Sequence, residues 1–441
     1  MKAWLDRFFQ IEQSGSTFRR EWIGGLTTFA AMAYILAVNP LILADAGMPR
    51  DALITVTALA AAFGCFLMAG IAKYPIALAP GMGTNAYFAY VICIGMQVPW
   101  QAALGITLWN GVIFLILSVT GLREKLAAAL PGAIKLGIQA GIGIFIAFIG
   151  LTNVGIIIGD SATLVTIGNL ASPASILVVL GLVLIVVLSA RRVPGAILIS
   201  IFAISVIGLI IFDGGERITA LPSGIVSLPA GVGEVFLQVD WLYPFREFSG
   251  EVLTILITLL ILDLFDSLGT LVGLARRAGF MDEKGNMPRM GRALSADATA
   301  TIGGALLGTS TTTSYVESAA GIEAGARTGL ASVYTGLLFL LALIFTPLLQ
   351  VIPAVATTPA LVMVGLLMMQ GLRDLDFSDL SESAPALLTM LMIPLTFSIT
   401  EGIGLGLIVY TALQVALGRW RSVPILTYFI AVGFAVYFAF I

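Results

Sequence analysis

The sequence predicts an all-α, polytopic membrane protein, and three observations carry that prediction. Of the 441 residues, 59% are apolar and 11% are charged, whereas a soluble domain carries about 25% charged residues. The mean hydropathy is +1.04. Many apolar segments reach the ~20 residues that an α-helix needs to span the hydrocarbon core of a bilayer. A chain with so little charge lacks the polar surface that keeps a soluble protein in solution.

The apolar segments form two sets of seven, so we expect 14 transmembrane spans. The first set lies near residues 22–44, 51–72, 84–96, 101–121, 131–158, 173–190 and 194–212. The second set lies near residues 250–275, 293–307, 314–326, 329–351, 353–371, 384–399 and 402–418. A last apolar stretch, 422–440, either crosses the membrane or lies flat on it, and the sequence leaves both alternatives open.

The basic residues predict how the chain is oriented. Residues 1–21 mix aromatic and charged side chains at helical spacing, which is typical of a short interfacial helix on a membrane surface. Cytoplasmic loops are enriched in Lys and Arg. If the N-terminus lies in the cytoplasm, only Arg50, Arg217 and Arg246 of the 22 basic residues fall on the opposite side. We therefore expect a multi-pass protein of the cell (inner) membrane with a cytoplasmic N-terminus.

The two sets of spans predict an internal repeat. Because each set contains an odd number of spans, a second copy of the unit must insert upside down, as in many secondary transporters. Asn39 matches Asp266 at a separation of 227 residues. Asn85-Ala86-Tyr87 matches Thr313-Ser314-Tyr315 at a separation of 228 residues. We therefore expect two inverted repeats of seven spans.

Two segments in corresponding positions, 74–85 and 308–317, are poor membrane helices. The first contains two prolines and two glycines, and the second is polar and rich in β-branched residues. Both predict a short extended stretch that leads into a half-helix, in spans 3 and 10, with Asn85 and Thr313 at the half-helix starts. Free N–H groups at such starts suit an acceptor-rich ligand. Broken backbone at membrane depth lines a cavity or is buried in protein, so the pair indicates a binding site near the bilayer midplane.

Carboxyl groups inside the apolar segments are functional candidates, because a charge at the membrane centre costs ~2.5–3.5 kcal/mol on insertion scales. Asp266 lies inside an apolar run, and Glu317 is expected one turn into the second half-helix. No basic residue lies nearby in the sequence, so we favour a functional role for both. For Asp263, Asp297 and Glu401 we favour a structural role in packing or at an interface.

The two amides at matched positions are also candidates. For Asn39, a functional role and a role in helix packing are equal alternatives. For Asn85 we favour a functional role, because it lies at the start of a half-helix.

Residue types also exclude several kinds of chemistry. The chain has no histidine, which excludes histidine metal ligands and leaves proton transfer to carboxyl groups or, less readily, lysine. Cys65 and Cys93 both lie in apolar stretches and indicate neither a disulfide framework nor a metal cluster. We therefore expect no metal and no cofactor. The net charge of −3 gives no indication of a nucleic-acid partner.

Two buried carboxyl groups can couple a solute to a proton. A carboxylate only accepts hydrogen bonds, whereas a protonated carboxyl also donates one. A heterocycle with ring N–H groups offers matching donors, and each hydrogen bond to a charged group contributes roughly 1.5–3 kcal/mol. If binding of the solute, or movement of the loaded site, requires a proton on Asp266 or Glu317, the proton and the solute move together. This coupling is proton symport.

Four motifs resemble those of the AzgA-like purine permeases. The first consists of Gly24-Gly25-Leu26-Thr27-Thr28-Phe29, Met32-Ala33-Tyr34-Ile35 and Val38-Asn39-Pro40. The others are Ala79-Pro80-Gly81-Met82-Gly83-Thr84-Asn85-Ala86-Tyr87, Asp263-Leu264-Phe265-Asp266-Ser267-Leu268-Gly269-Thr270 and Gly308-Thr309-Ser310-Thr311-Thr312-Thr313-Ser314-Tyr315-Val316-Glu317-Ser318. The resemblance covers essentially the whole chain. These permeases belong with the nucleobase–ascorbate transporters, which share the uracil permease fold.

The resemblance implies fourteen spans divided between a core domain and a gate domain. The core holds spans 1–4 and 8–11, and the gate holds spans 5–7 and 12–14. The implied segments are an N-terminal interfacial segment (1–21), core (22–121), gate (122–212), an external loop (213–249), core (250–351), and gate with the terminal apolar stretch (352–441).

The resemblance also implies which residues bind the substrate. Related permeases place an acid of span 8 and an acid of span 10 against the base, and these positions correspond here to Asp266 and Glu317. The neighbouring positions that would face the base are Tyr315 and Val316 on span 10 and Asn85 and Ala86 on span 3. The uracil branch has a histidine where this chain has Thr270, so a coupling scheme that needs that histidine cannot operate here.

The implied function is import of a purine nucleobase by proton symport, through an elevator-like or rocking cycle, with guanine or hypoxanthine favoured. The protein would sit in membrane lipid, and because relatives with this fold often dimerise, a homodimer stays open. Alternatives are a transporter of the same fold for adenine, another nucleobase or a small anion, although an anion site would be expected to offer a cation instead of Glu317. A channel is less favoured because no ring of charge or filter motif is present. An intramembrane enzyme would need a nucleophile–base pair or metal ligands.

Overall fold

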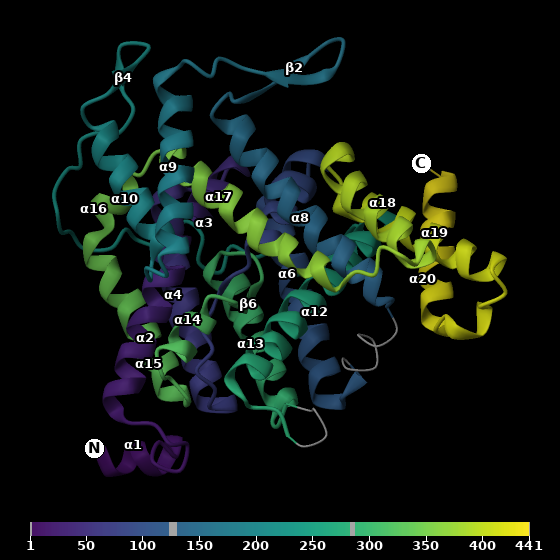
Figure 1. Cartoon of the computed structure of the whole chain (residues 1–441), viewed down its shortest axis with the longest axis horizontal. Coiled ribbons are helices and arrows are strands. Elements are labelled where there is room, and N and C mark those ends of the chain that lie inside the picture. Colours follow the sequence, from purple (N-terminus) through teal and green to yellow (C-terminus); the bar gives the residue numbers. More distant parts are fainter. Residues whose placement is uncertain (1, 123–129, 283–286, 441) are drawn as a thin grey trace.

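The computed structural model describes residues 2–122, 130–282 and 287–440, and it shows a bundle of helices (Figure 1). In the first half, the helices are α1 (Lys2–Phe9), α2 (Phe18–Met32), α3 (Ile35–Asp45), α4 (Arg50–Leu67), α5 (Met82–Ala86), α6 (Trp100–Thr120), α8 (Gly132–Asn153), α9 (Pro173–Ala190), α10 (Ala196–Gly208) and α11 (Tyr243–Arg246). Two π-helical turns, Met68–Ala72 and Tyr87–Gly95, continue α4 and α5. The strands are β1 (Leu78–Pro80), β2 (Ile157–Asp160), β3 (Leu164–Ile167), β4 (Phe212–Asp213) and β5 (Glu216–Arg217).

The second half of the chain holds the remaining elements. Its helices are α12 (Gly250–Ala278), α13 (Met290–Leu307), α14 (Ser318–Glu323), α15 (Gly329–Ala342), α16 (Thr346–Gln350), α17 (Ala354–Met368), α18 (Leu380–Thr396), α19 (Ile399–Ala416) and α20 (Ile425–Phe440). Strand β6 (Thr312–Ser314) precedes α14, and 3₁₀ turns occupy Leu343–Phe345, Met369–Asp374 and Trp420–Ser422.

The long helices have the dimensions of membrane spans. Within the described residues, 9 helical segments are long and apolar enough to cross a membrane. Three shorter apolar helices, α10, α18 and α20, accompany them. Each apolar segment of the sequence contains helix, but three differ at an end. Helix α8 ends at Asn153 before β2, α10 ends at Gly208 before β4, and the segment 314–326 begins in β6 and is helical only over Ser318–Glu323. The chain is therefore a multi-pass membrane protein, while the number of 14 spans stays a prediction.

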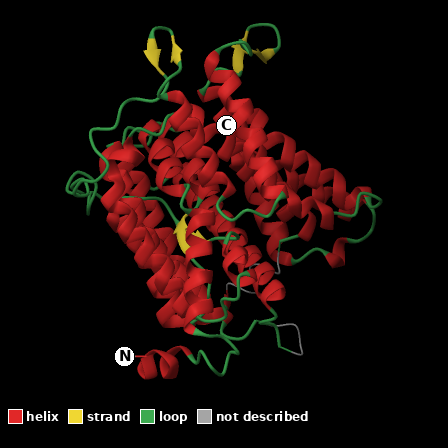
Figure 2. Cartoon of the chain, turned by 60° about the vertical axis from the view of Figure 1, so that its left-hand side comes forward, coloured by secondary structure: helices red, strands yellow, loops and turns green. Residues whose placement is uncertain are grey.

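The molecule has two distinct ends. Helix α1 lies at one end, and the β2–β3 and β4–β5 hairpins lie at the opposite end (Figures 1 and 2). Arg217, one of the basic residues expected on the external side, lies in β5 and thus at the end away from α1. Arg123, Lys125 and Lys284, which the charge pattern assigns to the cytoplasmic side, lie outside the described residues.

The two broken segments meet in the middle of the bundle as a short antiparallel pair, β1 and β6 (Figure 2). Ala79 pairs with Thr313, and both strands are buried throughout. Two glycines let the neighbouring helices approach this closely. A Cβ at Gly64 of α4 would stand 2.8 Å from the Leu78 Cβ, and one at Gly304 of α13 would stand 2.6 Å from the Thr312 Oγ1. The expected extended stretches are therefore present as strands.

Three details of the half-helices differ from the sequence prediction. Thr313 does not start a half-helix, because it lies in the middle of β6. Helix α14 starts at Ser318, so Glu317 is its N-cap residue and does not lie one turn inside it. The strands begin at residues 78 and 312, a separation of 234, so the expected match of Asn85 with Thr313 is out of register. In the structure Asn85 belongs to α5, after the strand.

Helix α12 positions the middle of the bundle. The Ser249 side chain accepts a hydrogen bond from the Val252 N–H and caps its start, and Gly279 in the left-handed conformation (φ +70°) ends it. The helix is 29 residues long. At 1.5 Å per residue, Asp266 lies about 24 Å from one end and about 18 Å from the other. Asp266 therefore lies deep inside the bundle.

The expected gate elements pack on one another through small residues. A Cβ at Gly137 of α8 would stand 2.4 Å from the Ala386 carbonyl oxygen of α18. Similarly, a Cβ at Gly143 of α8 would stand 2.5 Å from the Gly365 carbonyl oxygen of α17. Small residues at such crossings let membrane helices approach closely. Helix α8 is thus held between α17 and α18.

A buried acid links the first helix of one half to a helix of the other half. Glu21 of α2 is fully buried. Its Oε1 accepts hydrogen bonds from Ser16 Oγ (2.6 Å) and the Arg327 N–H (2.9 Å). Its Oε2 accepts from the N–H groups of Thr328 (3.3 Å) and Ala331 (3.2 Å), where α15 begins. The carboxylate thus satisfies backbone donors that a helix start leaves unpaired.

We expect Glu21→Ala to lower the stability of the folded protein. The change leaves buried N–H groups without an acceptor, and hydrogen bonds to a charged group contribute roughly 1.5–3 kcal/mol each. Thermal unfolding of the purified protein in detergent measures the loss. Glu12→Ala, which removes an exposed acid of the same N-terminal region, is the matched control. Equal unfolding temperatures for the two variants would contradict the capping role.

Candidate functional site

A cavity of about 170 Å³ lies beside β6 and the start of α14. One wall is formed by α12, and a second by β6 and the turn into α14. The α12 residues that line it are Asp266, Gly269, Thr270 and Gly273, spaced three and four apart so that they share one helix face. Residues 313 to 317 line the second wall. The opposite side is closed by Gln139 of α8 and by the apolar side chains Val364, Leu367 and Met368.

Glu317 faces this cavity and is held by a tyrosine from the first helix pair. The Tyr34 hydroxyl donates a hydrogen bond to Glu317 Oε1 at 2.8 Å. Tyr34 stands at the break between α2 and α3, and only 1% of its surface is exposed. The interruption of the helix at this point therefore places a buried donor against the acid at the start of α14.

Asp266 faces the same cavity from α12. The Thr313 hydroxyl of β6 donates a hydrogen bond to Asp266 Oδ2 at 3.1 Å. The strand thus connects the two acids, because Thr313 lies in β6 and Glu317 follows it by four residues, at the start of α14. Among the described residues that line this cavity, none is Lys or Arg. Two carboxyl groups consequently share a small cavity whose other polar groups are hydroxyls, backbone and one amide.

Behind the strands, Asn39 and Asn85 form a fully buried hydrogen-bond network. Asn85 Nδ2 donates to Asn39 Oδ1 at 2.5 Å, and the Ser310 hydroxyl donates to Asn85 Oδ1. Asn39 Nδ2 donates to Thr57 Oγ1 at 2.7 Å and to Thr309 Oγ1 at 3.4 Å. The network ties α3, α4 and α5 to the segment before β6.

Two further acids of this region have structural partners. Ser267 Oγ donates to Asp297 Oδ2 at 2.6 Å, and Ser314 Oγ donates to Asp297 Oδ1 at 3.3 Å. Asn110 Nδ2 donates to Asp263 Oδ2 at 3.3 Å. Both acids are fully buried. These contacts are those of structural acids, which is the role that the sequence favours for both.

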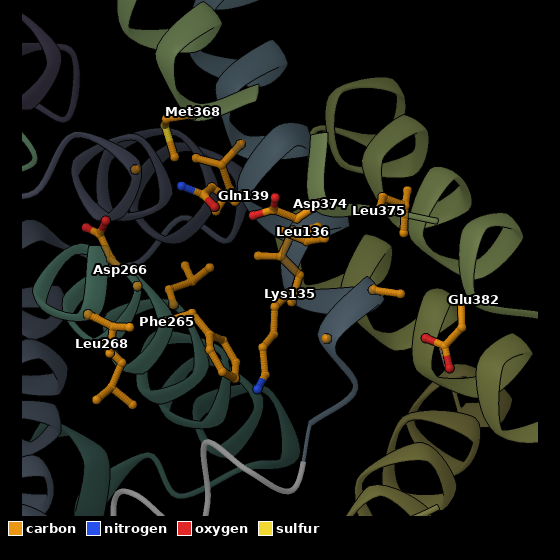
Figure 3. A pocket seen from close by; sticks show the side chains of 18 of the residues that line it. Lys135, Leu136, Gln139, Phe265, Asp266, Leu268, Met368, Asp374, Leu375 and Glu382 are labelled. Atoms are coloured by element: carbon orange, nitrogen blue, oxygen red, sulfur yellow. The ribbon is translucent and has the colours of Figure 1, made fainter. Parts of the chain in front are cut away.

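A larger cavity of about 640 Å³ adjoins the small one (Figure 3). It extends along α8 and α12 toward Lys135, Asp374 and Glu382. Lys135 lies over the Phe265 ring, with Nζ 5.1 Å from the ring centroid. The two cavities share several lining residues, Asp266 among them, so they meet beside α8 and α12.

The structure brings together only part of the expected site. The expected residues that line the small cavity are Asp266, Thr270, Tyr315, Val316 and Glu317. Asn39, Asn85 and Ala86 are buried behind it and are absent from its lining.

Other lining residues were not among the candidates, chiefly Tyr34, Gly83, Gln139 and Thr313. Tyr34 and Gly83 lie in the motifs that carry the family resemblance, and Thr313 lies in the second broken segment, so a signal for these three was present. Gln139 is one of a few polar residues in the apolar helix α8, and the sequence offers no further signal for it.

Within the described residues, no group of three or more Cys, Asp or Glu side chains is placed to hold a metal ion. The polar side chains that line the small cavity are two carboxyl groups, several hydroxyls and an amide. Such a set accepts hydrogen bonds from a ligand that carries N–H groups.

Comparison with known proteins identifies relatives along the whole chain. The guanine/hypoxanthine permease PbuG of Bacillus subtilis is 44% identical, over 99% of this chain and 100% of that protein. The adenine permease AdeP of Escherichia coli is 40% identical, over 99% of this chain and 96% of that protein.

A solved structure shares the fold. The transmembrane domain of the cyanobacterial bicarbonate transporter BicA superposes with a TM-score of 0.63 at 16% identity, over 87% of this chain and 96% of that one. At this identity the likeness concerns the fold alone. The model of the Permease family matches residues 19–405, which include the broken segments, α12 and the cavity residues. The chain therefore belongs to the Permease family, the family of the nucleobase–ascorbate transporters.

Proposed function

We propose that this protein is a secondary active transporter that imports purine nucleobases by proton symport across the cell (inner) membrane, with its N-terminus in the cytoplasm. The observation that carries the proposal is the pair of carboxyl groups, Asp266 and Glu317, in one small cavity deep in a permease fold. Relatives of the chain are named as guanine/hypoxanthine and adenine permeases. Identities to the two groups overlap, at 34–44% and 40%, so the preference for guanine or hypoxanthine rests on the motif resemblance.

The cavity suits the edge of a purine. Guanine and hypoxanthine present ring N–H donors and a C6 carbonyl acceptor. A carboxylate at Asp266 or Glu317 accepts from the N–H groups, and the hydroxyl of Thr270 can donate to a ring acceptor. Each hydrogen bond to a charged group contributes roughly 1.5–3 kcal/mol. A few such bonds would account for recognition of a small, uncharged ring.

The same two acids supply the coupling to protons. Electrostatic repulsion between Asp266 and Glu317 falls when a proton binds to one of them, and the protonated group becomes a donor. Tyr34 already donates to one oxygen of Glu317, and Thr313 donates to one oxygen of Asp266. The other oxygen of each acid is left for a ligand or a proton. Base and proton then favour each other's binding, and this reciprocal linkage is symport in thermodynamic form.

The position of the cavity supports a division of the protein into two moving bodies. We assign α12, β6 and α14 to the core and α8 and α17 to the gate, with the cavity between them. On another part of this boundary, Thr400 of α19 is hydrogen-bonded to Tyr87 (2.9 Å between hydroxyl oxygens) and to Thr258 of α12 (3.0 Å). An elevator-like or rocking movement of the core against the gate would break these hydroxyl contacts and expose the cavity on the other side.

A transporter of the same fold with another substrate is the second candidate. Adenine presents an amino group and an acceptor N1, and the relative named adenine permease is nearly as similar as the guanine/hypoxanthine one. A single carboxyl group serves either purine by changing its protonation. A small anion fits poorly, because both acids of the cavity would repel it.

Uptake measurements test the proposal directly. Cells that lack their own purine permeases and express this protein should accumulate radiolabelled guanine and hypoxanthine, and a protonophore should abolish most of the accumulation. Cells carrying the empty vector give the background. Uptake of no purine, or accumulation that is indifferent to the proton gradient, would remove the basis of the proposal.

We expect Asp266→Asn and Glu317→Gln each to abolish purine transport, with at least roughly a 100-fold loss of uptake rate, because each removes a charged acceptor worth 1.5–3 kcal/mol and the proton site. Both proteins should still fold and insert, as judged by gel filtration in detergent. Glu323→Gln, at the exposed end of the same short helix as Glu317, is the matched control and should transport normally. Full transport by either site variant would refute the role of that acid.

Asn85→Leu distinguishes a supporting role from a direct contact with the base. The leucine leaves Asn39 Oδ1 and Ser310 Oγ without the partners that Asn85 provides, and each buried unsatisfied group costs about 1–3 kcal/mol. We therefore expect a lower unfolding temperature in the absence of any substrate, whereas the exposed variant Gln13→Leu should not change it. A variant that unfolds normally but no longer binds purine would instead show that Asn85 contacts the substrate directly.

A further inference from the structure

A ligand that moves between the two cavities must pass the residues that line both. These residues are Gly83, Gln139, Asp266, Gly269 and Met368. The two glycines offer backbone and Met368 offers a thioether, so Gln139 and Asp266 are the two with strong hydrogen-bonding side chains. Gln139 comes from α8 and Asp266 from α12, which we have assigned to the gate and the core.

The Gln139 amide is available to a ligand. Its side chain is exposed to the cavities, and within the described part of the chain it has no hydrogen-bond partner. Its Oε1 stands 3.1 Å from the position that a Cβ of Gly371 would occupy, so the glycine leaves room for the amide. Figure 3 shows the amide reaching from α8 into the space that Asp266 borders from the other side.

The space between them is suited to a flat ring. A Cβ added at Gly269 or Gly273 would meet no atom within 4 Å, so α12 presents a strip without side chains next to Asp266. Among the residues that α8 and α17 contribute to the small cavity, Gln139 is polar and the described others are apolar. Hydrogen bonding from the gate side therefore depends on this one amide.

We propose that Gln139 is the gate-side contact of the transported base and helps determine which purine is bound. An amide holds a donor and an acceptor in one plane and pairs with an edge that offers both, as the N6/N7 edge of adenine does. Asp266 in its charged form only accepts. A base bound between them contacts Asp266 on the core side, which pairs only with N–H donors. On the gate side it contacts Gln139, which distinguishes an edge that carries both a donor and an acceptor from an edge that carries only one kind.

This inference rests on the proposed function and adds a conformational consequence to it. In the proposed cycle, Gln139 and Asp266 lie on bodies that move against each other. The base can therefore contact both residues only while α8 of the gate lies against the core. The affinity for the substrate is then higher while the gate lies against the core, because Gln139 adds a contact that the core alone cannot supply.

The test measures the dissociation constants of guanine, hypoxanthine and adenine for the purified full-length protein in detergent. Gln139→Leu should weaken the preferred purine by roughly 5- to 100-fold, since a buried edge loses its partner. Gln139→Glu keeps the shape but offers acceptors only, so it should change the ranking of guanine against adenine. Leu136→Met, on the same helix but lining only the larger cavity, is the control and should bind as the unaltered protein does.

The outcomes separate the two proposals. Unaltered protein that binds no purine would sink the proposed function and this inference with it. If it binds purines and Gln139→Leu retains their affinities within twofold, only the role of Gln139 falls. A loss in Gln139→Leu without any change of ranking in Gln139→Glu also overturns it, because the amide donor is then not recognised. Should Gln139→Leu fail to fold, the ranking in Gln139→Glu decides alone.

Discussion

The antiparallel pairing of β1 with β6 is the constraint on which the site depends. Both segments leave helical structure inside the bundle, where backbone N–H and C=O groups find no water and must pair with each other. The register that opposes Ala79 and Thr313 fixes where α5 and α14 begin. It therefore also fixes Glu317 at the start of α14 and brings the Thr313 hydroxyl to Asp266. A shift of one residue would turn Thr313 to the other face of the pair and separate it from the acid.

Polar residues around this pair fall into two layers with different tasks. Behind the strands, Asn39 and Asn85 bond to each other and to neighbouring hydroxyls, so that their polar groups hold the break in place. In front of the strands, Asp266 and Glu317 each accept one hydroxyl and keep the rest of their surface on the cavity. An internally hydrogen-bonded back layer lets the front layer keep unused hydrogen-bonding capacity, which is the property that the proposed binding site requires.

The sequence predicted the helices and the broken segments well, because hydrophobic length and the positions of Pro and Gly act locally. It also singled out Asp266 and Glu317, since acids in apolar segments are rare for energetic reasons. It could not predict the strand register, so it placed Thr313 at a helix start and Glu317 inside a helix. Gln139 was missed because its proposed role depends on what faces it across the cavity, and an amide in an apolar helix carries no information about its neighbours.

The contact of Thr400 with Tyr87 and Thr258 joins the proposed core and gate through hydroxyl groups alone. Each such neutral hydrogen bond contributes only about 0.5–1.5 kcal/mol net, so this part of the boundary can open at modest cost. Separating neutral groups does no electrical work against the membrane potential and is not screened by salt. The voltage dependence of the proposed transport cycle would then originate in the carboxyl groups and their proton, and this hydroxyl contact would be electrically silent.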